Sequence, residues 1–343
     1  MPNAIDRLAF RAAQRLRRSW FRGHWLAAAA IDRGRRPPAG GSPGPSRRDL
    51  DADLDALVAA DWAAIEAGRY LPPDALRGRP GRVLAASRAF LLDVPRVARR
   101  RRAGGHQEVA AAAAADGLPR YYRQNFHFQT DGWLSRESAR LYDFQVEVLF
   151  GGAADAMRRG ALVPLAETLR AAGPGARMAD LACGTGRFLA AVKDNWPRLP
   201  VLGIDLSQAY LAEAAGRLRS RRNVALVQAP AERLPLADAS LDAVTCIYLF
   251  HELPPRVRSA VAAEIARVLR PGGRLVLVDS LQRGDHPPYD GLLERFPAMF
   301  HEPYFESWLA LDLARLFGSV GLRPGPAERR FLSRIAAFDK PAA

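Results

Sequence analysis

The chain has 343 residues, of which 49% are hydrophobic and 25% are charged, a composition typical of a soluble globular protein. No apolar run approaches the ~18 residues of a membrane-spanning helix, and no export signal is evident, so we expect a cytoplasmic location. The two cysteines, Cys183 and Cys246, provide neither a disulfide framework nor a Cys-X-X-Cys motif, and no metal site is expected.

The net charge of +14 is concentrated in the N-terminal third of the chain. Two segments, 1–48 and 77–102, together carry about +17, so the remaining residues are slightly negative. The basic character therefore belongs to the N-terminal region and not to the α/β part described below.

The first predicted element is an amphipathic helix over residues 4–26. At ~100° per residue, its apolar face collects Ile5, Leu8, Ala9, Ala12, Leu16 and Trp20. Its basic side, about 130° away, collects Arg7, Arg11, Arg15, Arg18 and Arg22. Such a helix either docks on its own protein with solvated arginines or makes peripheral contact with an anionic membrane surface. Both interpretations stay open at this point.

The chain divides into four predicted parts. Residues 1–33 hold the basic helix, 34–48 form a Pro/Gly linker, and 49–118 form a helical extension. Within the extension we expect a helix over 49–70 and a second basic amphipathic segment over 81–102, interrupted by Pro95. The fourth part, 119–343, carries the α/β pattern.

In this fourth part, a helical segment over 138–173 is predicted to break near Gly151–Gly152. Short β-like runs and helical runs then alternate. The predicted strands are 177–182, 201–205, 224–228, 241–248 and 274–279, with helices over 187–196, 207–219 and 255–270. A helix over 307–321 and two antiparallel strands, 322–332 and 333–340, complete the chain. The pattern predicts an α/β fold with a doubly wound, Rossmann-like, seven-stranded and mostly parallel sheet.

The turn after the first predicted strand reads MADLACGTGRF, residues 178–188. A dinucleotide fingerprint needs a third glycine at position 189, where this chain has Leu189, and the Gly-Lys-Ser/Thr of a P-loop is absent. The turn therefore favours a nucleoside that carries no pyrophosphate. About twenty residues on, Asp205 ends a strand, where its carboxylate can accept the hydroxyl groups of a ribose.

Three further motifs follow in order, VQAPAERLPL (227–236), DAVTCIYLFHELPP (242–255) and VLRPGGRLVLVDS (268–280). With them, residues 140–340 resemble the class I S-adenosylmethionine-dependent methyltransferases, and most closely the ubiquinone/menaquinone C-methyltransferase group. The resemblance implies S-adenosylmethionine as the cofactor and 119–343 as the methyltransferase domain, with a lid insertion at about 280–306.

The resemblance also implies roles for individual residues. The methionine end of the cofactor would be held by Asp180, Ala182, Gly184 and Gly186. Asp205 would take the ribose, Leu206 would flank the adenine, and the loop with Ala231 and Glu232 would close over the adenine edge. Tyr248 would lie at the mouth where the methyl group emerges.

Two departures from the family pattern affect the cofactor site. Ala182 replaces the first glycine of the loop, and Pro230 replaces the acidic residue that usually contacts the adenine amine. Adenine recognition is therefore expected to use main-chain groups.

Methyl transfer from a sulfonium needs alignment and, for a phenol or an activated carbon, a proton acceptor. His251 and Glu252 follow the fourth strand and are the candidate catalytic residues. Candidate substrate contacts are His286, Tyr289, His301 and Tyr304 in the lid, together with His127 and Tyr142 in the aromatic segment 121–145. The alternative for both segments is that these side chains form the packing core of a cover.

The favoured function is methyl transfer to an apolar or aromatic small molecule that is quinone- or lipid-like. The alternative is an RNA methyltransferase that grips phosphates with its basic N-terminal region. Nucleic acid is the less favoured partner because the arginines are not interleaved with aromatic residues that stack on bases. A cofactor-binding regulator without turnover is a third possibility. The sequence does not indicate whether the protein is a monomer or an oligomer.

Overall fold

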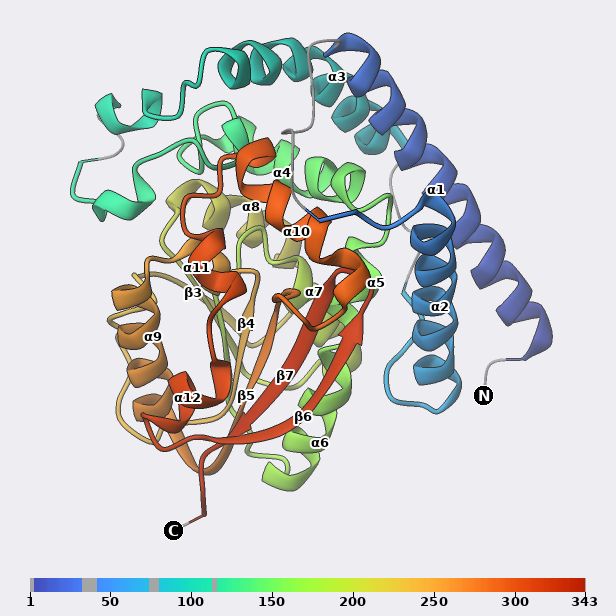
Figure 1. Cartoon of the computed structure of the whole chain (residues 1–343). Coiled ribbons are helices and arrows are strands. Elements are labelled where there is room, and N and C mark those ends of the chain that lie inside the picture. The colour runs from blue at the N-terminus through green and yellow to red at the C-terminus, as the bar shows by residue number, and fades with distance from the viewer. Residues whose placement is uncertain (1–2, 33–41, 74–79, 113–115, 343) are drawn as a thin grey trace.

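The computed structural model describes residues 3–32, 42–73, 80–112 and 116–342. Within this part of the chain lies a seven-stranded sheet of order β3-β2-β1-β4-β5-β7-β6 (Figure 1). The predicted fold class is confirmed. The strands are β1 (Met178–Leu181), β2 (Val201–Asp205), β3 (Val224–Gln228), β4 (Leu241–Ile247), β5 (Leu269–Ser280), β6 (Arg323–Arg330) and β7 (Ser333–Asp339).

The direction of the strands fixes where a ligand can bind. The first five strands pair in parallel, whereas β7 pairs antiparallel with both β5 and β6. Strand β1 lies between β2 and β4, so the chain runs outward from β1 in both directions along the sheet. In open α/β sheets, ligands bind at this switch point, beyond the carboxyl ends of the strands. The glycine turn after β1 occupies that position.

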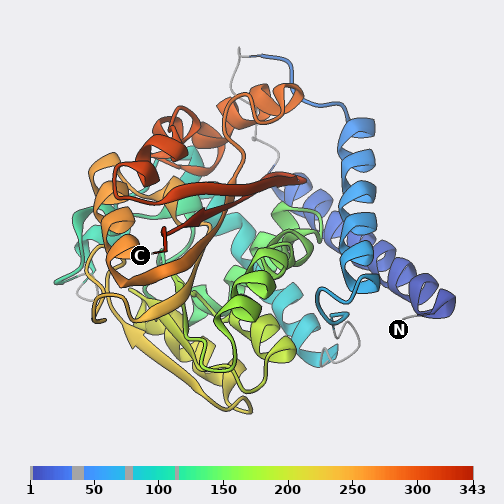
Figure 2. The same cartoon turned by 90° about the horizontal axis from the view of Figure 1, so that it is seen from below.

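Helices cover both faces of the sheet (Figure 2). Each face has its own hydrophobic core. One face carries α6 (Leu162–Ala172), α7 (Arg187–Asn195) and α8 (Gln208–Leu218), whose Leu165, Leu189 and Ala214 are buried. The other carries α9 (Pro255–Val268), α11 (Phe305–Leu309) and α12 (Leu313–Gly318). The two cores explain why the central strands β1 and β4 read as nearly continuous apolar runs, since they are buried on both sides.

Two helical predictions need correction. The segment 138–173 breaks at Gly151 and Gly152 as expected, and both glycines have positive φ, but it breaks again near Gly160. It forms α4 (Arg136–Leu149), α5 (Ala154–Arg159) and α6. The single helix predicted over 307–321 is instead α11 and α12, because Asp312 leaves the helical conformation and caps α12 by accepting the amide of Arg315 at 2.9 Å. The lid region holds α10 (Asp290–Phe300).

The N-terminal extension consists of α1 (Ala4–Ile31), α2 (Arg47–Glu66) and α3 (Pro80–Arg102), and α1 contacts both others and α4. Most of the predicted linker 34–48 lies outside the described residues. Its last two residues belong to α2, which begins after Ser46 because that side chain accepts the amide of Asp49. Pro95 does not interrupt α3, whose Phe90 and Ala98 are buried in the extension. No helix of the described residues is both long and apolar enough to cross a membrane.

The face by which α1 packs is not its predicted apolar face. The helix buries Phe10, Gln14, Phe21 and His24, with Arg17 alongside in ion pairs. The predicted face is exposed, with Ile5, Leu8 and Leu16 at 75%, 67% and 74% of full exposure. The physical reason is that polar side chains of the packing face find hydrogen-bond partners there; Ser87 Oγ, for example, lies 2.6 Å from His24 Nε2.

Candidate active site

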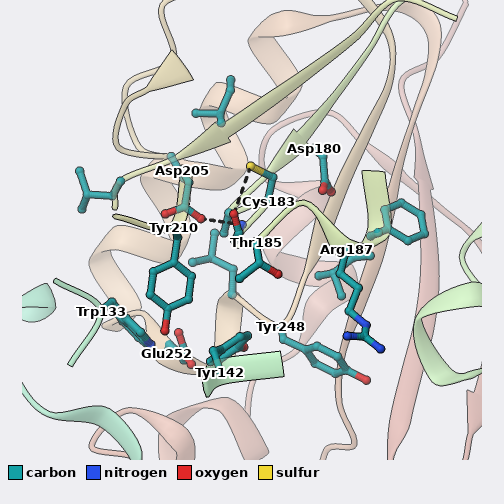
Figure 3. A pocket seen from close by; sticks show the side chains of 18 of the residues that line it. Trp133, Tyr142, Asp180, Cys183, Thr185, Arg187, Asp205, Tyr210, Tyr248 and Glu252 are labelled. Atoms are coloured by element: carbon teal, nitrogen blue, oxygen red, sulfur yellow. Dashed lines mark hydrogen bonds between the residues drawn. The ribbon is translucent and has the colours of Figure 1, made fainter. Parts of the chain in front are cut away.

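A cavity of about 130 Å³ opens at the carboxyl ends of β1, β2 and β4. Its floor carries Asp180 and Asp205, from the tips of β1 and β2 (Figure 3). Tyr142, Trp133 and Glu252 lie across from them in the same view. The cavity thus combines two acids on the strand side with a mostly aromatic cover, as a site for a charged nucleoside and a flat apolar molecule requires.

The glycine turn is held in place by Asp205. Its carboxylate accepts the backbone N–H of Gly184 at 2.8 Å and that of Ser207 at 2.8 Å. Ala182, Gly184 and Gly186 all have positive φ, of 54°, 54° and 71°. Ala182 and Gly184 line the cavity. Gly186 is the N-cap of α7 and packs against α8, where an added Cβ would lie 3.1 Å from the Cβ of Ala214.

Asp180 is buried and accepts a hydrogen bond from Thr245 Oγ1 at 2.6 Å. Burial raises the pKa of Asp180 to about 7, against the lowering effect of that hydrogen bond. Burial likewise raises the pKa of Asp205 to about 6, although three backbone amides lower it. A cationic group bound beside Asp180 would therefore restore its ionised form, which makes the site selective for positive charge.

The residues predicted for the adenine side divide into two groups. Leu206 and Ala231 line the cavity. Glu232 does not; both of its carboxylate oxygens lie 2.9 Å from the hydroxyl of Tyr121, which donates to them. Glu232 therefore joins the loop after β3 to the aromatic cover.

Tyr248 lines the cavity just beyond β4, in a left-handed conformation with φ of 57°. Its hydroxyl and that of Ser333 lie 2.7 Å apart, its ring stacks on Phe150, and Arg158 lies over the ring at 5.7 Å. Burial raises the pKa of Tyr248 to about 12, so it is a neutral donor near neutral pH.

His251 and Glu252, the candidate catalytic pair, occupy different depths. Glu252 lines the cavity, whereas His251 lies behind it with Nδ1 2.6 Å from Asp279 Oδ1 and Nε2 3.8 Å from Glu252 Oε1. Burial lowers the pKa of His251, but the Asp279 carboxylate outweighs burial and the net shift is upward. Burial and the nearby Glu302 raise the pKa of Glu252 well above its usual range.

The candidate substrate residues are spread over three places. Tyr142 lines the cavity, and His127 lies beside it in an ion pair with Glu302. The ring of His301 stacks on His106, and Tyr304 holds Arg258 through its carbonyl oxygen, so neither side chain lines the cavity.

His286 and Tyr289 lie at a different contact. The hydroxyl of Tyr289 donates to Asp53 of α2 at 2.7 Å, and His286 Nε2 lies 3.9 Å from the same carboxylate. These two residues join the lid region to the N-terminal extension, away from the cavity.

The cavity residues that were not singled out from the sequence include Arg158, Thr185, Arg187 and Tyr210. Arg187, at the start of α7, pairs with Asp155 at 2.5 Å and lies 3.6 Å from Glu147. Arg17 of α1 pairs with the same two acids, at 3.2 and 2.7 Å. The position of Arg187 directly after the Gly-X-Gly turn could have indicated that it lies at the cavity. Its acidic partners could not be identified, because they are distant in the sequence.

Comparison with known proteins identifies relatives of this chain. Residues 178–273 match the family model described as a methyltransferase domain. A demethylmenaquinone methyltransferase of Beutenbergia cavernae is 40% identical over 141 residues, which cover 41% of this chain and 54% of that protein. A demethylmenaquinone methyltransferase of Deinococcus radiodurans is 35% identical over 185 residues, which cover 53% of this chain and 70% of that protein.

A solved S-adenosylmethionine-dependent methyltransferase from Aquifex aeolicus is 20% identical, with a TM-score of 0.40, over 52% of this chain and 89% of that chain. The alignments span about half of the first relative and more than two thirds of the second. The chain belongs to the class I S-adenosylmethionine-dependent methyltransferases. Within that class it falls in the ubiquinone/menaquinone C-methyltransferase group, and S-adenosylmethionine is the cofactor of the family.

Proposed function

We propose that the protein transfers the methyl group of S-adenosylmethionine to an apolar or aromatic small molecule that is quinone-like. The observation that carries this proposal is the pair Asp180 and Asp205, which faces an aromatic cover across one cavity at the switch point of the sheet. The two relatives described above are named for methyl transfer to a demethylated menaquinone, which supports a quinone-like acceptor here.

The cofactor would be held from the strand side. Asp180 receives its amino group and Asp205 its ribose hydroxyls, while Leu206 and Ala231 border the adenine. The cationic side chain of Arg158 lines the same cavity and is suited to the cofactor carboxylate. When bound, the cofactor supplies an activated methyl group, so the protein mainly aligns the two reactants and excludes water.

The acceptor would lie between the cofactor and the cover. Tyr122, Trp133, Tyr142 and Tyr210 supply the aromatic surface, which suits a flat ring. Glu252, the acid that lines the cover side, is placed to take up the proton that the acceptor loses. His251 and Asp279 lie behind it. These residues would hold the acceptor in line with the methyl group that the bound cofactor would supply.

A label-partition experiment tests the activity. The full chain is incubated with methyl-labelled S-adenosylmethionine and a cell extract, which is then separated into organic, aqueous, RNA and protein fractions. We expect label in the organic fraction, lost in Asp205→Asn and retained in the matched variant Asp238→Asn, whose side chain is exposed. Label in the RNA fraction would replace this proposal with RNA methylation, and cofactor binding without any transfer would indicate a regulator.

We further propose that the outer face of α1 binds an anionic membrane surface. Ile5, Leu8 and Leu16 are exposed there, and Arg7, Arg11 and Arg15 are exposed on the adjoining side of the helix. An exposed apolar stripe bordered by arginines complements both the acyl region and the headgroups of an anionic bilayer.

Sedimentation with phosphatidylglycerol vesicles tests this contact. The wild type should pellet with the vesicles, whereas the double variant Leu8→Asp and Leu16→Asp should remain in the supernatant. Leu71→Asp is the control, because Leu71 is 58% exposed at a site beyond α2. Equal sedimentation of the double variant and the wild type would refute membrane binding by this face.

A further inference from the structure

Three side chains from distant segments converge beside the cavity. His127 belongs to the short 3₁₀ helix η4 (Phe126–Phe128), Glu252 to η5 (Phe250–Glu252), and Glu302 follows α10. One nitrogen or oxygen atom of each lies within 4.8 Å of those of the other two. Glu252 also lines the cavity, so the cluster borders the place proposed for the acceptor.

Glu302 is the most deeply buried member of the cluster. Glu302 is 2% exposed. Among the described residues, neither of its carboxylate oxygens has a hydrogen-bond partner. Its contact is an ion pair with Nε2 of His127. A buried carboxylate whose one partner is an imidazole stays poorly compensated for its lost hydration, so a further positive charge would stabilise this arrangement.

The surrounding charged groups do not supply that charge directly. His251 faces Glu252, but its Nδ1 is taken by Asp279. Arg258 is buried nearby and donates to the carbonyl oxygens of Phe250 and Tyr304, not to either glutamate. Among the described residues, the Glu302 carboxylate therefore has the His127 imidazole as its ion-pair partner, and the Glu252 carboxylate has the more distant His251, at 3.8 Å.

One imidazole nitrogen and two carboxylates are a common ligand set for divalent ions that prefer nitrogen and oxygen donors. We propose that His127, Glu252 and Glu302 bind a divalent transition-metal cation such as Mn²⁺ or Zn²⁺ at the edge of the cavity. Three protein ligands leave coordination positions open, and Glu252 places the site at the edge of the cavity. The assignment of this site depends on no feature of the cofactor.

The cation would give the acceptor a defined chemical class. An acceptor with a hydroxyl or carbonyl oxygen, such as a hydroquinone, could place that oxygen in an open position, where the cation favours its ionised form. With Glu252 serving as a ligand, the hydroxyl proton would pass to solvent and its electron pair would remain on the acceptor. The ionised acceptor would then attack the methyl carbon as the methyl–sulfur bond breaks and its electron pair stays on sulfur. This part of the inference rests on the proposed function, whereas metal binding itself does not.

Metal binding to the full chain tests the site. After treatment with a chelator and its removal, the protein is titrated with Mn²⁺ while the spin-resonance signal of free Mn²⁺ is recorded, and with Zn²⁺ by calorimetry. We expect one ion per chain, at least about tenfold weaker binding in Glu302→Gln and His127→Ala, and unchanged binding in Glu306→Gln. Glu306 is the matched control because it is exposed four residues further along.

Binding of S-adenosylhomocysteine is measured on the same samples. If that ligand binds but neither metal ion does, or if Glu302→Gln binds Mn²⁺ as tightly as the wild type, the metal site is refuted and the proposed function stands. If the metal ion binds and S-adenosylhomocysteine does not, the proposed function fails and the metal site stands. A folded Glu302→Gln variant is verified by its melting temperature, which should not fall, since the substitution removes a buried charge.

Discussion

The carboxylate of Asp205 accepts the backbone amide of Gly184 at 2.8 Å, which fastens the tip of β2 to the turn that follows β1. The same carboxylate accepts the amide of Ser207, so the group expected to hold the ribose also shapes the loop beneath the cofactor. Binding and loop geometry are therefore linked through one side chain.

Asp205→Asn should weaken the binding of S-adenosylhomocysteine at least about tenfold. The amide can still accept a bond from Gly184, but it loses the charge, and a hydrogen bond to a charged group contributes about 1.5–3 kcal/mol. Calorimetry gives the dissociation constant, and circular dichroism verifies the fold. Wild-type affinity in this variant would contradict the role of Asp205.

Cofactor affinity should increase as the pH rises toward 7 and then level off. The pKa of Asp180 is about 7 in the empty site, so below that pH a growing fraction of the protein carries a neutral carboxyl that attracts a cationic amino group less. The affinity for S-adenosylhomocysteine, measured between about pH 5.5 and 8.5, should change by up to about tenfold per unit below pH 7. Asp180→Asn should remove most of this slope, leaving the smaller dependence due to Asp205.

The same shift predicts how the stability of the empty protein depends on pH. Because the folded pKa of Asp180 lies above its usual value of 3.8, the folded state binds more protons than the unfolded state between these two values. The stability associated with this group is present below about pH 4 and is lost as the pH rises through 7. In Asp180→Asn, urea unfolding should lack this contribution.

Gly186→Ala should destabilise the protein by about 2–4 kcal/mol. A Cβ at this position would lie 3.0 Å from Leu218 Cδ1, and its φ of 71° disfavours any other residue. The control is Gly216→Ala in α8, where a Cβ meets nothing within 4 Å, and which should stabilise by about 0.5–1 kcal/mol. Denaturant unfolding measures both, and equal effects would show that the packing of α7 on α8 does not depend on Gly186.

Ala182→Gly should stabilise the protein by up to about 1 kcal/mol. Ala182 has φ of 54°, where a Cβ costs about 1–2 kcal/mol, while the greater freedom of glycine in the unfolded chain offsets part of that gain. Ala182 replaces the first glycine of the family loop, so the substitution restores that pattern. A loss of stability would show that the Cβ of Ala182 makes a compensating contact.

Much of the α/β part, residues 119–343, can be predicted from the sequence, because the patterns that indicate its elements are local. The strand runs, the glycine turn and the acid at the tip of β2 each depend on neighbours within a few residues. In a parallel sheet, the carboxyl ends of the strands lie at one edge, so Asp180 and Asp205 had to come together. The break at Gly151 follows in the same way from two adjacent glycines.

The remainder depends on pairings across more than a hundred residues. Glu302 lies beside His127 and Glu252, yet nothing around any of the three distinguishes a ligand from a packing residue in a cover. The packing face of α1 could not be predicted for the same reason. Gln14 and His24 are polar, and the sequence does not show which residues they contact when buried. The more apolar stripe with Ile5 and Leu8 was therefore the one that the pattern identified.

The acids Glu147 and Asp155 lie between Arg17 of α1 and Arg187 at the glycine turn. The two acids are therefore a common electrostatic partner of α1 and of the glycine turn. If a membrane holds α1 in a position that moves Arg17, the cofactor affinity must change, and cofactor binding must then change membrane affinity by the same factor. The coupling free energy between the two sites would be read from either one: the amount of protein on vesicles with and without S-adenosylhomocysteine, or its dissociation constant with and without vesicles.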